Sequence, residues 1–154
     1  MLVYSIDEPF VLVHSLNWRK NGKAMVMTMR HDRVSIEPFL GTDPNQWWYV
    51  GRNGELMNKS SSEYTKYLNQ KEGCMDLDIS TKPITMWVLD AMGEHSRKYR
   101  VVPRQCPQKA LRCTLGSFTV GLENVAVEDD SNGWYFLTLN EMLEKKAAHV
   151  RPLS

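Results

Sequence analysis

The chain has 154 residues, of which 42% are hydrophobic, and a formal net charge of +1 from 19 basic and 18 acidic side chains. A chain of this length fits one domain and can bury about two-thirds of its unfolded surface, which excludes wholesale disorder. The balanced charge argues against a nucleic-acid or membrane-surface binder, because such proteins usually carry a clear basic excess.

Cysteine usage and the opening residues favour an intracellular chain. Cys74, Cys106 and Cys113 cannot all pair within one chain, and they are expected to be buried thiols in a reducing compartment. The opening MLVYSIDEPFVLVHSL lacks a basic leader and a cleavage site, so no signal peptide is expected. No apolar run approaches the roughly 18 residues of a membrane span. In a mature fragment of a secreted precursor, Asn58-Lys59-Ser60 would be a glycosylation acceptor.

The first third of the chain is predicted to form short strands, because β-branched, aromatic and alternating apolar residues lie between turn residues. The predicted strands are Phe10–His14, Ala24–Met29, Val34–Phe39 and Trp47–Val50. Asn53-Gly54 follows the last of them and predicts a β-hairpin, because both residues tolerate positive φ.

Two segments have helical signals. Ser60 and Glu63 have the spacing of a capping box ahead of an apolar group, which predicts a short helix there. The segment 140–148 has helical propensity, and Glu141 lies four residues ahead of Lys145.

The strongest signal is an internal repeat of strand, strand, polar loop and aromatic strand. The aromatic residues are Trp48, Tyr99 and Trp134, and each follows a short β-type segment by a similar interval. Three units of roughly 40 residues predict an all-β, threefold closed barrel. The predicted unit boundaries within a single domain 1–154 are about 8–58, 73–105 and 108–153, with an insertion near 60–73.

The repeat resembles the β-trefoil of ricin-type lectins, in which each unit carries a Q-x-W signature. Gln46-Trp47-Trp48 matches that signature, while 96–99 and 131–134 resemble degenerate copies. Gly73–Leu77 is similar to the family's strand of cysteine, apolar residue, aspartate and apolar residue. Ile84–Trp87 is similar to the next strand, which ends in the aromatic residue that stacks on the ligand. The resemblance therefore implies a β-trefoil and a carbohydrate ligand.

In the second unit, the resemblance places Asp76 on the family's carboxylate and Trp87 on its stacking aromatic. Ser96 and Arg97 replace the asparagine and glutamine that orient the sugar. A carboxylate suits two hydroxyl donors, and a flat ring suits the apolar face of a pyranose. The alternative is that Asp76 caps a turn and Trp87 is a half-buried barrel residue.

The first and third units lack the carboxylate and the aromatic. Val26 and Glu37 occupy these positions in the first unit. In the third they are taken by Arg112 or Cys113 and by Glu123. Sugar binding is not expected in either unit.

The remaining polar and aromatic residues of the signature have structural roles in this interpretation. Asn45 and Gln46 are expected to satisfy the backbone of their own loop. Trp48 is expected in the threefold core, whereas Trp47 alternates to the opposite strand face and is a secondary contact candidate.

Catalysis is not expected, because the histidines and cysteines lack metal-site or nucleophile spacing, and no cofactor or metal is implied. The predicted function is non-catalytic recognition of a glycan or glycoprotein, with avidity from homo-oligomerisation or a second domain. A signalling trefoil is the alternative, because residues 147–153 resemble the closing strand of fibroblast growth factors. A trefoil that binds only a protein partner is the third possibility.

Overall fold

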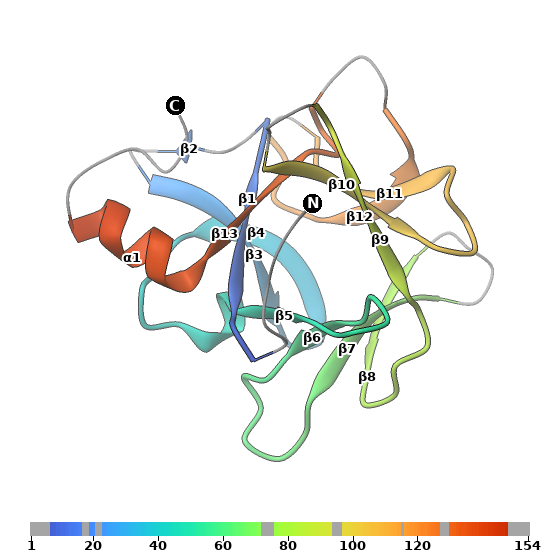
Figure 1. Cartoon of the computed structure of the whole chain (residues 1–154), viewed down its shortest axis with the longest axis horizontal. Helices are drawn as coiled ribbons and strands as arrows, with labels where there is room; N and C mark the ends of the chain where they lie inside the picture. Colours follow the sequence, from blue (N-terminus) through green and yellow to red (C-terminus); the bar gives the residue numbers. More distant parts are fainter. Residues whose placement is uncertain are drawn as a thin grey trace.

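The computed structural model describes residues 7–16, 19–20, 23–71, 76–93, 97–114, 116–126 and 130–147. These residues form short strands and one α-helix (Figure 1). In chain order the elements are β1 (Phe10–His14), β2 (Arg19–Lys20), β3 (Lys23–Arg30), β4 (Arg33–Pro38), the 3₁₀ helix η1 (Pro44–Gln46), β5 (Trp48–Val50), β6 (Leu56–Asn58), β7 (Lys66–Gln70), β8 (Leu77–Ser80), β9 (Trp87–Ala91), β10 (Lys98–Pro103), β11 (Lys109–Arg112), β12 (Gly121–Asn124), β13 (Trp134–Thr138) and α1 (Leu139–Ala147).

The strands form three similar units, and this architecture is a β-trefoil. The units are β1-β3-β4-β5, β6-β7-β8-β9 and β10-β11-β12-β13. In each unit the two middle strands pair as an antiparallel hairpin. The outer strands pair between units, as β1 with β13, β5 with β6 and β9 with β10. The predicted all-β trefoil is confirmed, and β2 is a short addition that pairs with β3.

The barrel interior holds the largest side chains of the core. Phe10 and Leu12 of β1 point inward, and Phe10 packs against Phe136 with ring centroids 5.9 Å apart. Val11 and Val13 alternate to the outer face of the same strand, where they join a second buried cluster. Each fully buried side chain of this size contributes about 1.5–3 kcal/mol to folding.

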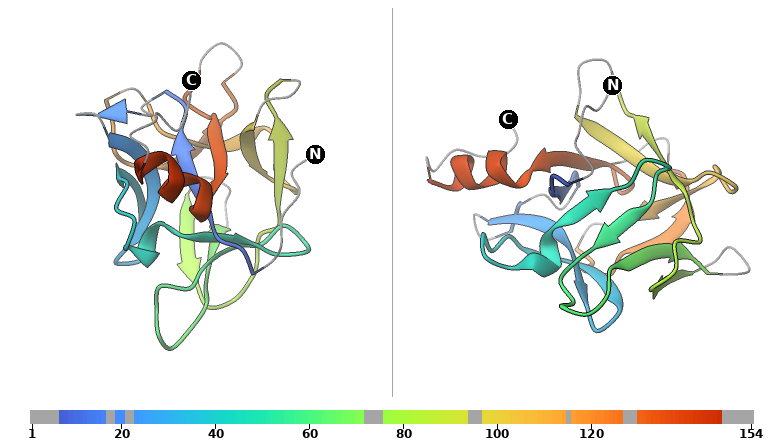
Figure 2. Two further views of the ribbon diagram at one scale, coloured as in Figure 1. Left: turned by 60° about the vertical axis from the view of Figure 1, so that its left-hand side comes forward. Right: turned by 60° about the horizontal axis from the view of Figure 1, so that its bottom comes forward.

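Helix α1 covers that outer face. Thr138 Oγ1 accepts from Glu141 N at 3.1 Å, and Glu141 Oε1 accepts from Thr138 N at 2.9 Å, which together form a capping box. Met142 is buried against Val11 and Val13. In Figure 2, α1 lies beside β1 and β13 at the edge of the barrel. The helical propensity of this segment is confirmed. The growth-factor-like closing strand is not formed at Ala147, which is helical, and 148–153 lies outside the described residues.

Two predictions for residues 60–73, an insertion and a short helix, are both wrong. Residues 60–65 are not helical, and Ser61 Oγ makes only local contacts with the following amides. Strand β7 follows directly and is the first hairpin strand of the second unit. Because β6 also belongs to that unit, the predicted boundary at residue 58 is too late by one strand. Residues 72–75, with Cys74, lie outside the described part.

The predicted strands at β1, β3, β4 and β5 are confirmed, as is the hairpin at Asn53-Gly54. Gly54 has φ +95°, and an added Cβ there would lie 2.3 Å from Trp87 O. Its carbonyl accepts from Trp87 N at 2.8 Å, so the β5–β6 turn is fixed to the start of β9. Asn58 is fully buried and donates to Asn45 O, so the sequon side chain is inaccessible in the folded protein.

Candidate functional site

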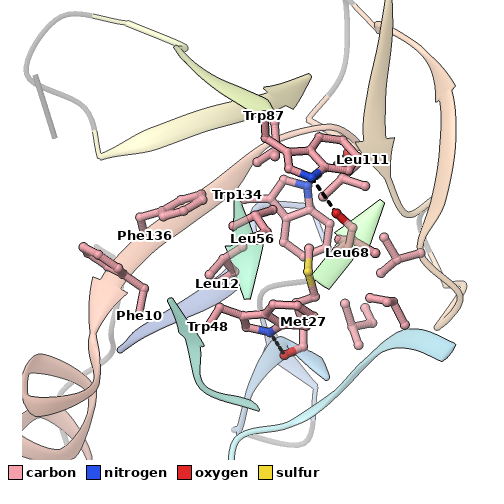
Figure 3. Close-up of a cluster of buried hydrophobic side chains, with 14 of the residues drawn as sticks. Phe10, Leu12, Met27, Trp48, Leu56, Leu68, Trp87, Leu111, Trp134 and Phe136 are labelled. Atoms are coloured by element: carbon pink, nitrogen blue, oxygen red, sulfur yellow. Dashed lines mark hydrogen bonds between the residues drawn. The ribbon is translucent and has the colours of Figure 1, made fainter. Parts of the chain in front are cut away.

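Three tryptophans hold equivalent positions in the three units. The indoles of Trp48, Trp87 and Trp134 are 0%, 3% and 0% exposed. Each N–H donates to a carbonyl on the first hairpin strand of its own unit, at 3.0, 2.8 and 3.0 Å. The acceptors are the carbonyls of Met27, Leu68 and Leu111, and Figure 3 shows the first two of these bonds. Satisfying a buried indole N–H in this way fixes each tryptophan as a core residue.

The predicted stacking role of Trp87 is therefore wrong. Its ring is buried, so it offers no face to a sugar. The error arose because Trp87 is the second unit's copy of Trp48, whereas the sequence repeat assigned that position to Tyr99. Tyr99 lies in β10 and packs edge-on against Phe136, with ring centroids 5.6 Å apart.

Asp76 and Arg97 are not brought together by described contacts. Asp76 is exposed just before β8, and its carbonyl accepts from Lys71 N at 2.8 Å. Arg97 instead pairs with Glu141 on α1, with Nη2 2.6 Å from Oε1. The hydrogen bonds from Arg97, more than any other contact, lower the pKa of Glu141 to about 2. Arg97 thus anchors the helix, and Ser96 lies outside the described residues.

Gln46 of the Q-x-W signature is also structural. Its side chain is fully buried, accepts from Leu40 N at 2.9 Å and donates to Pro38 O at 3.0 Å. Asn45 accepts at its carbonyl from Asn58. The prediction that the signature's polar side chain satisfies its own loop is confirmed for Gln46, which is buried and cannot reach a ligand; the bonds described for Asn45 are made by its backbone.

Trp47, the other secondary contact candidate, is half-buried. Its ring nitrogen is itself buried and has no hydrogen-bond partner among the residues that the structure describes. Only part of its side chain is available at the surface, so Trp47 does not form an open stacking platform.

In the other two units, an asparagine side chain takes the place of Gln46 and accepts hydrogen bonds from the backbone of a loop. In the second, Asn69 accepts from the amides of Ile84 and Thr85, each at 3.0 Å, and donates to Lys82 O. In the third, Asn132 accepts from Ala126 N at 2.7 Å, as Gln46 does from Leu40 N.

The strand register identifies one equivalent cross-strand pair in the hairpin of each unit. The cross-strand pair adjacent to each tryptophan's acceptor is Val26–Glu37 in the first unit. It is Tyr67–Ser80 in the second and Ala110–Glu123 in the third. None of these three pairs combines a carboxylate with an aromatic ring.

A cleft at the junction of the first and third units has that combination. It has a volume of about 500 Å³, within the usual range for small-molecule sites. Met25 and Ile36, both buried, belong to its lining, and Phe118 and Glu37 line it as well. Phe118 is 44% exposed. The remaining lining residues are Lys23, Ser35 and Pro38.

The third unit's hairpin connection positions Phe118. The β3–β4 turn contains only His31 and Asp32, both at positive φ (52° and 58°), whereas the β11–β12 connection is longer. That connection reaches the edge of β4, where Phe118 O accepts from Ile36 N at 2.7 Å. Val34 O accepts from Val120 N at 3.2 Å. These backbone bonds hold the aromatic residue beside the first unit.

The carboxylate of Glu37 is held by an ion-pair network. Arg30 Nε lies 2.9 Å from both Glu37 carboxylate oxygens, and its Nη2 pairs with Asp43. Glu37 keeps its remaining lone pairs for other donors, because a carboxylate has about four acceptor positions. The site therefore offers a fixed acceptor, a lysine and serine as donors, and an exposed ring.

The sequence carried part of this signal. The resemblance assigns Glu37 to the position of the stacking aromatic and Val26 to that of the carboxylate, so no sugar site is predicted in the first unit. Phe118, an aromatic residue within a turn-rich segment, was an available sign of an exposed ring. Its pairing with Glu37 depends on long-range strand contacts that local patterns do not specify.

No group of three or more His, Cys, Asp or Glu side chains within the described ranges is arranged to hold a metal ion. Among those same residues, no helix has the length and apolar character needed to cross a membrane. Cys106 and Cys113 are both buried.

Solved structures of similar fold share little sequence with this chain. A GlcNAcα1-4Gal-releasing endo-β-galactosidase from Clostridium perfringens is 15% identical with a TM-score of 0.66, and the match covers 86% of this chain but 32% of the enzyme. ThreeFoil, a designed threefold-symmetric protein, is 16% identical with a TM-score of 0.59, covering 85% of this chain and 99% of the design. These likenesses support the trefoil fold alone. No protein-family model and no curated protein matches the sequence.

Proposed function

We propose that this protein is a non-catalytic recognition module that binds a carbohydrate in the cleft between Glu37 and Phe118. The observation that carries the proposal is that an exposed aromatic ring and an anchored carboxylate line one cleft. The ring stacks on the apolar face of a pyranose, and the carboxylate accepts hydrogen bonds from adjacent hydroxyls. This combination of ring and carboxylate is the one that the ricin-type resemblance implies. In the proposal it lies at the junction of the first and third units instead of in the second unit.

The composition of the cleft supports a neutral or weakly charged sugar. Arg30 and Asp43 accompany Glu37, so the carboxylate is part of a mixed-charge network instead of an isolated negative centre. Lys23 and Ser35 supply donors for ring or hydroxyl oxygens. One shallow site of this kind gives millimolar to high micromolar dissociation constants, and avidity requires oligomerisation or a second domain.

The test is a glycan array at physiological salt, followed by calorimetric titration of the sugars that bind. GlcNAcα1-4Gal belongs on the array, because the similar Clostridium enzyme releases it. Phe118→Ala and Glu37→Gln are each expected to weaken binding at least tenfold, about 1.4 kcal/mol. Glu123→Gln is the matched carboxylate control, since Glu123 occupies the equivalent strand position in the third unit. Tyr64→Ala, which removes another exposed ring, is the aromatic control.

Several outcomes contradict the proposal. Binding that survives both cleft substitutions but is lost in Asp76→Ala would return the site to the second unit. Binding only to sulfated glycans, with a collapse at high salt, would favour the growth-factor-like reading. A blank array would leave a protein as the ligand.

A further inference from the structure

The three units present equivalent cross-strand rows of side chains on the outer face of the barrel. The register aligns Tyr135–Val13–Val26, Tyr49–Met57–Tyr67 and Val88–Val102 as the first, second and third rows. Each row lies on the strand face opposite the core tryptophans, because side chains alternate along a strand. These rows are distinct from the Glu37–Phe118 cleft.

Helix α1 covers the first row. Val13 and Val26 are fully buried in one cluster with Met142. Tyr135 and Leu139 pack against the same cluster. Leu139 and Met142 are three residues apart, so they share one face of the helix. The barrel thus has a demonstrated way of packing an amphipathic helix across this kind of row.

The second row has the same cross-strand register, and the described contacts of α1 are with the first row instead. Tyr49, Met57 and Tyr67 are all half-buried, so each keeps an accessible part. Neighbouring strands are about 4.8 Å apart, which puts the two tyrosines about 10 Å apart, close to the diameter of a helix. Tyrosine and methionine are enriched at the centres of protein interfaces.

The second row also has a charged edge. The Lys59 ammonium lies 4.4 Å from the centroid of the Tyr49 ring, and burial and the charge of Asp7 raise the pKa of Tyr49, so charges of both signs border the apolar strip, with Lys59 on the ring itself. An acidic side chain on an approaching helix could pair with Lys59 while its apolar face rests on the tyrosines. The first row uses an acidic residue similarly, because Glu141 of α1 pairs with Arg97.

We propose that the second row, Tyr49–Met57–Tyr67, binds an amphipathic helix of a partner protein in the way that α1 binds the first row. The partner helix has apolar residues at the spacing of Leu139 and Met142 and an acidic residue directed at Lys59. This surface is separate from the carbohydrate site, so the protein can hold both ligands at once.

The probe is a helix-stabilised, labelled peptide with the sequence TLNEMLEKKA, taken from residues 138–147. The expected dissociation constant with the whole protein is about 10–500 μM. In NMR spectra, ring resonances of Tyr49 and Tyr67 should shift, while those of Tyr135 should not. Tyr49→Ser and Tyr67→Ser should each weaken binding at least tenfold.

Val88→Ser is the matched control, because Val88 is the third-row counterpart of Tyr49 and is 40% exposed. It should leave peptide affinity within twofold. Absence of binding at 1 mM peptide, or binding that Tyr49→Ser and Tyr67→Ser leave intact, overturns the proposal. The proposal is also overturned if the protein binds no peptide and Tyr49→Ser and Tyr67→Ser lose glycan binding, because the second row would then be a carbohydrate site. The cleft variants Phe118→Ala and Glu37→Gln keep peptide binding, so the two proposals fail independently.

Discussion

Arg112 donates a hydrogen bond to the last carbonyl of the third unit's hairpin, as Gln46 does in the first unit. Gln46 Nε2 donates to Pro38 O at 3.0 Å, and Arg112 Nη1 donates to Asn124 O at 3.1 Å. The two carbonyls are equivalent, because each residue ends the second strand of its hairpin. Asn132 accepts from a loop amide as Gln46 does, but its side-chain nitrogen is buried with no hydrogen-bond partner among the described residues.

A pair of substitutions can move the donor for Asn124 O from residue 112 to residue 132. We expect Arg112→Thr to lower the free energy of unfolding by about 0.5–1.5 kcal/mol, because Asn124 O and Ser131 Oγ lose their hydrogen bonds to Arg112. Adding Asn132→Gln should restore part of this loss, because the longer amide reaches the Asn124 carbonyl, as Gln46 reaches that of Pro38. Urea unfolding of the two variants and of Asn132→Gln alone measures the coupling. Simple additivity would show that the two sites are independent.

The core role of Trp87 predicts a stability effect without a binding effect. Trp87→Phe should lower the free energy of unfolding by about 1–3 kcal/mol, because Leu68 O loses its donor inside the protein. Glycan affinity measured on the folded variant should stay within twofold. Asp76→Ala, at an exposed position, should change stability by about 0.5 kcal/mol or less. Lost affinity in folded Trp87→Phe would restore its predicted ligand role.

Acid should loosen α1 through Glu141. Its folded-state pKa is about 2, below the ordinary 4.5, chiefly because Arg97 hydrogen-bonds the carboxylate. The stabilisation is therefore complete above pH 4.5 and is lost as pH falls towards 2. Because both side chains are partly exposed, we expect about 1 kcal/mol or less. Urea unfolding between pH 6 and 2.5 should show a shallower acid loss for Glu141→Gln than for the natural protein.

His14 should give a separate pH dependence at milder acidity. Burial lowers its pKa below 6.5, although its contact with Ser131 O opposes the shift. The unfolded chain then binds the proton more readily, so stability should fall as pH drops below 6.5. His14→Gln keeps a side-chain donor for Ser131 O and should flatten the loss between pH 7 and 5. An unchanged slope in that variant would assign the loss to other groups.

The sequence predicted the architecture better than it predicted the site. Alternating apolar strands, turn residues and an aromatic repeat are local features, and they led to the trefoil. The second unit was shifted because Ile84–Trp87 has the pattern of a hairpin strand as well as the start of a barrel strand. The pairing of β7 with β8 and of β9 with β10 distinguishes the two assignments, as does the hydrogen bond from Trp87 to Leu68 O, and all of these contacts join separate segments.

The spacing of Ser60 and Glu63 also predicted a helix cap in the wrong place. Ser60 and Glu63 have capping-box spacing, but β7 begins just afterwards and its pairing with β8 determines the local structure. The working capping box is Thr138–Glu141, at the end of a barrel strand. Likewise, Phe118 and Glu37 come from different units, so their proximity depends on tertiary contacts.

The pairing of β1 with β13 has a consequence for synthesis of the chain on the ribosome. Phe10 faces Thr138 across this strand pair, and its ring packs against Phe136, so its final environment is complete only when the last unit has emerged. Until then the nascent chain carries Phe10 and Leu12 without the strand that buries them. Apolar residues that are exposed in this way promote aggregation. Binding of chaperones to the nascent chain should therefore be strongest just before the third unit leaves the ribosome.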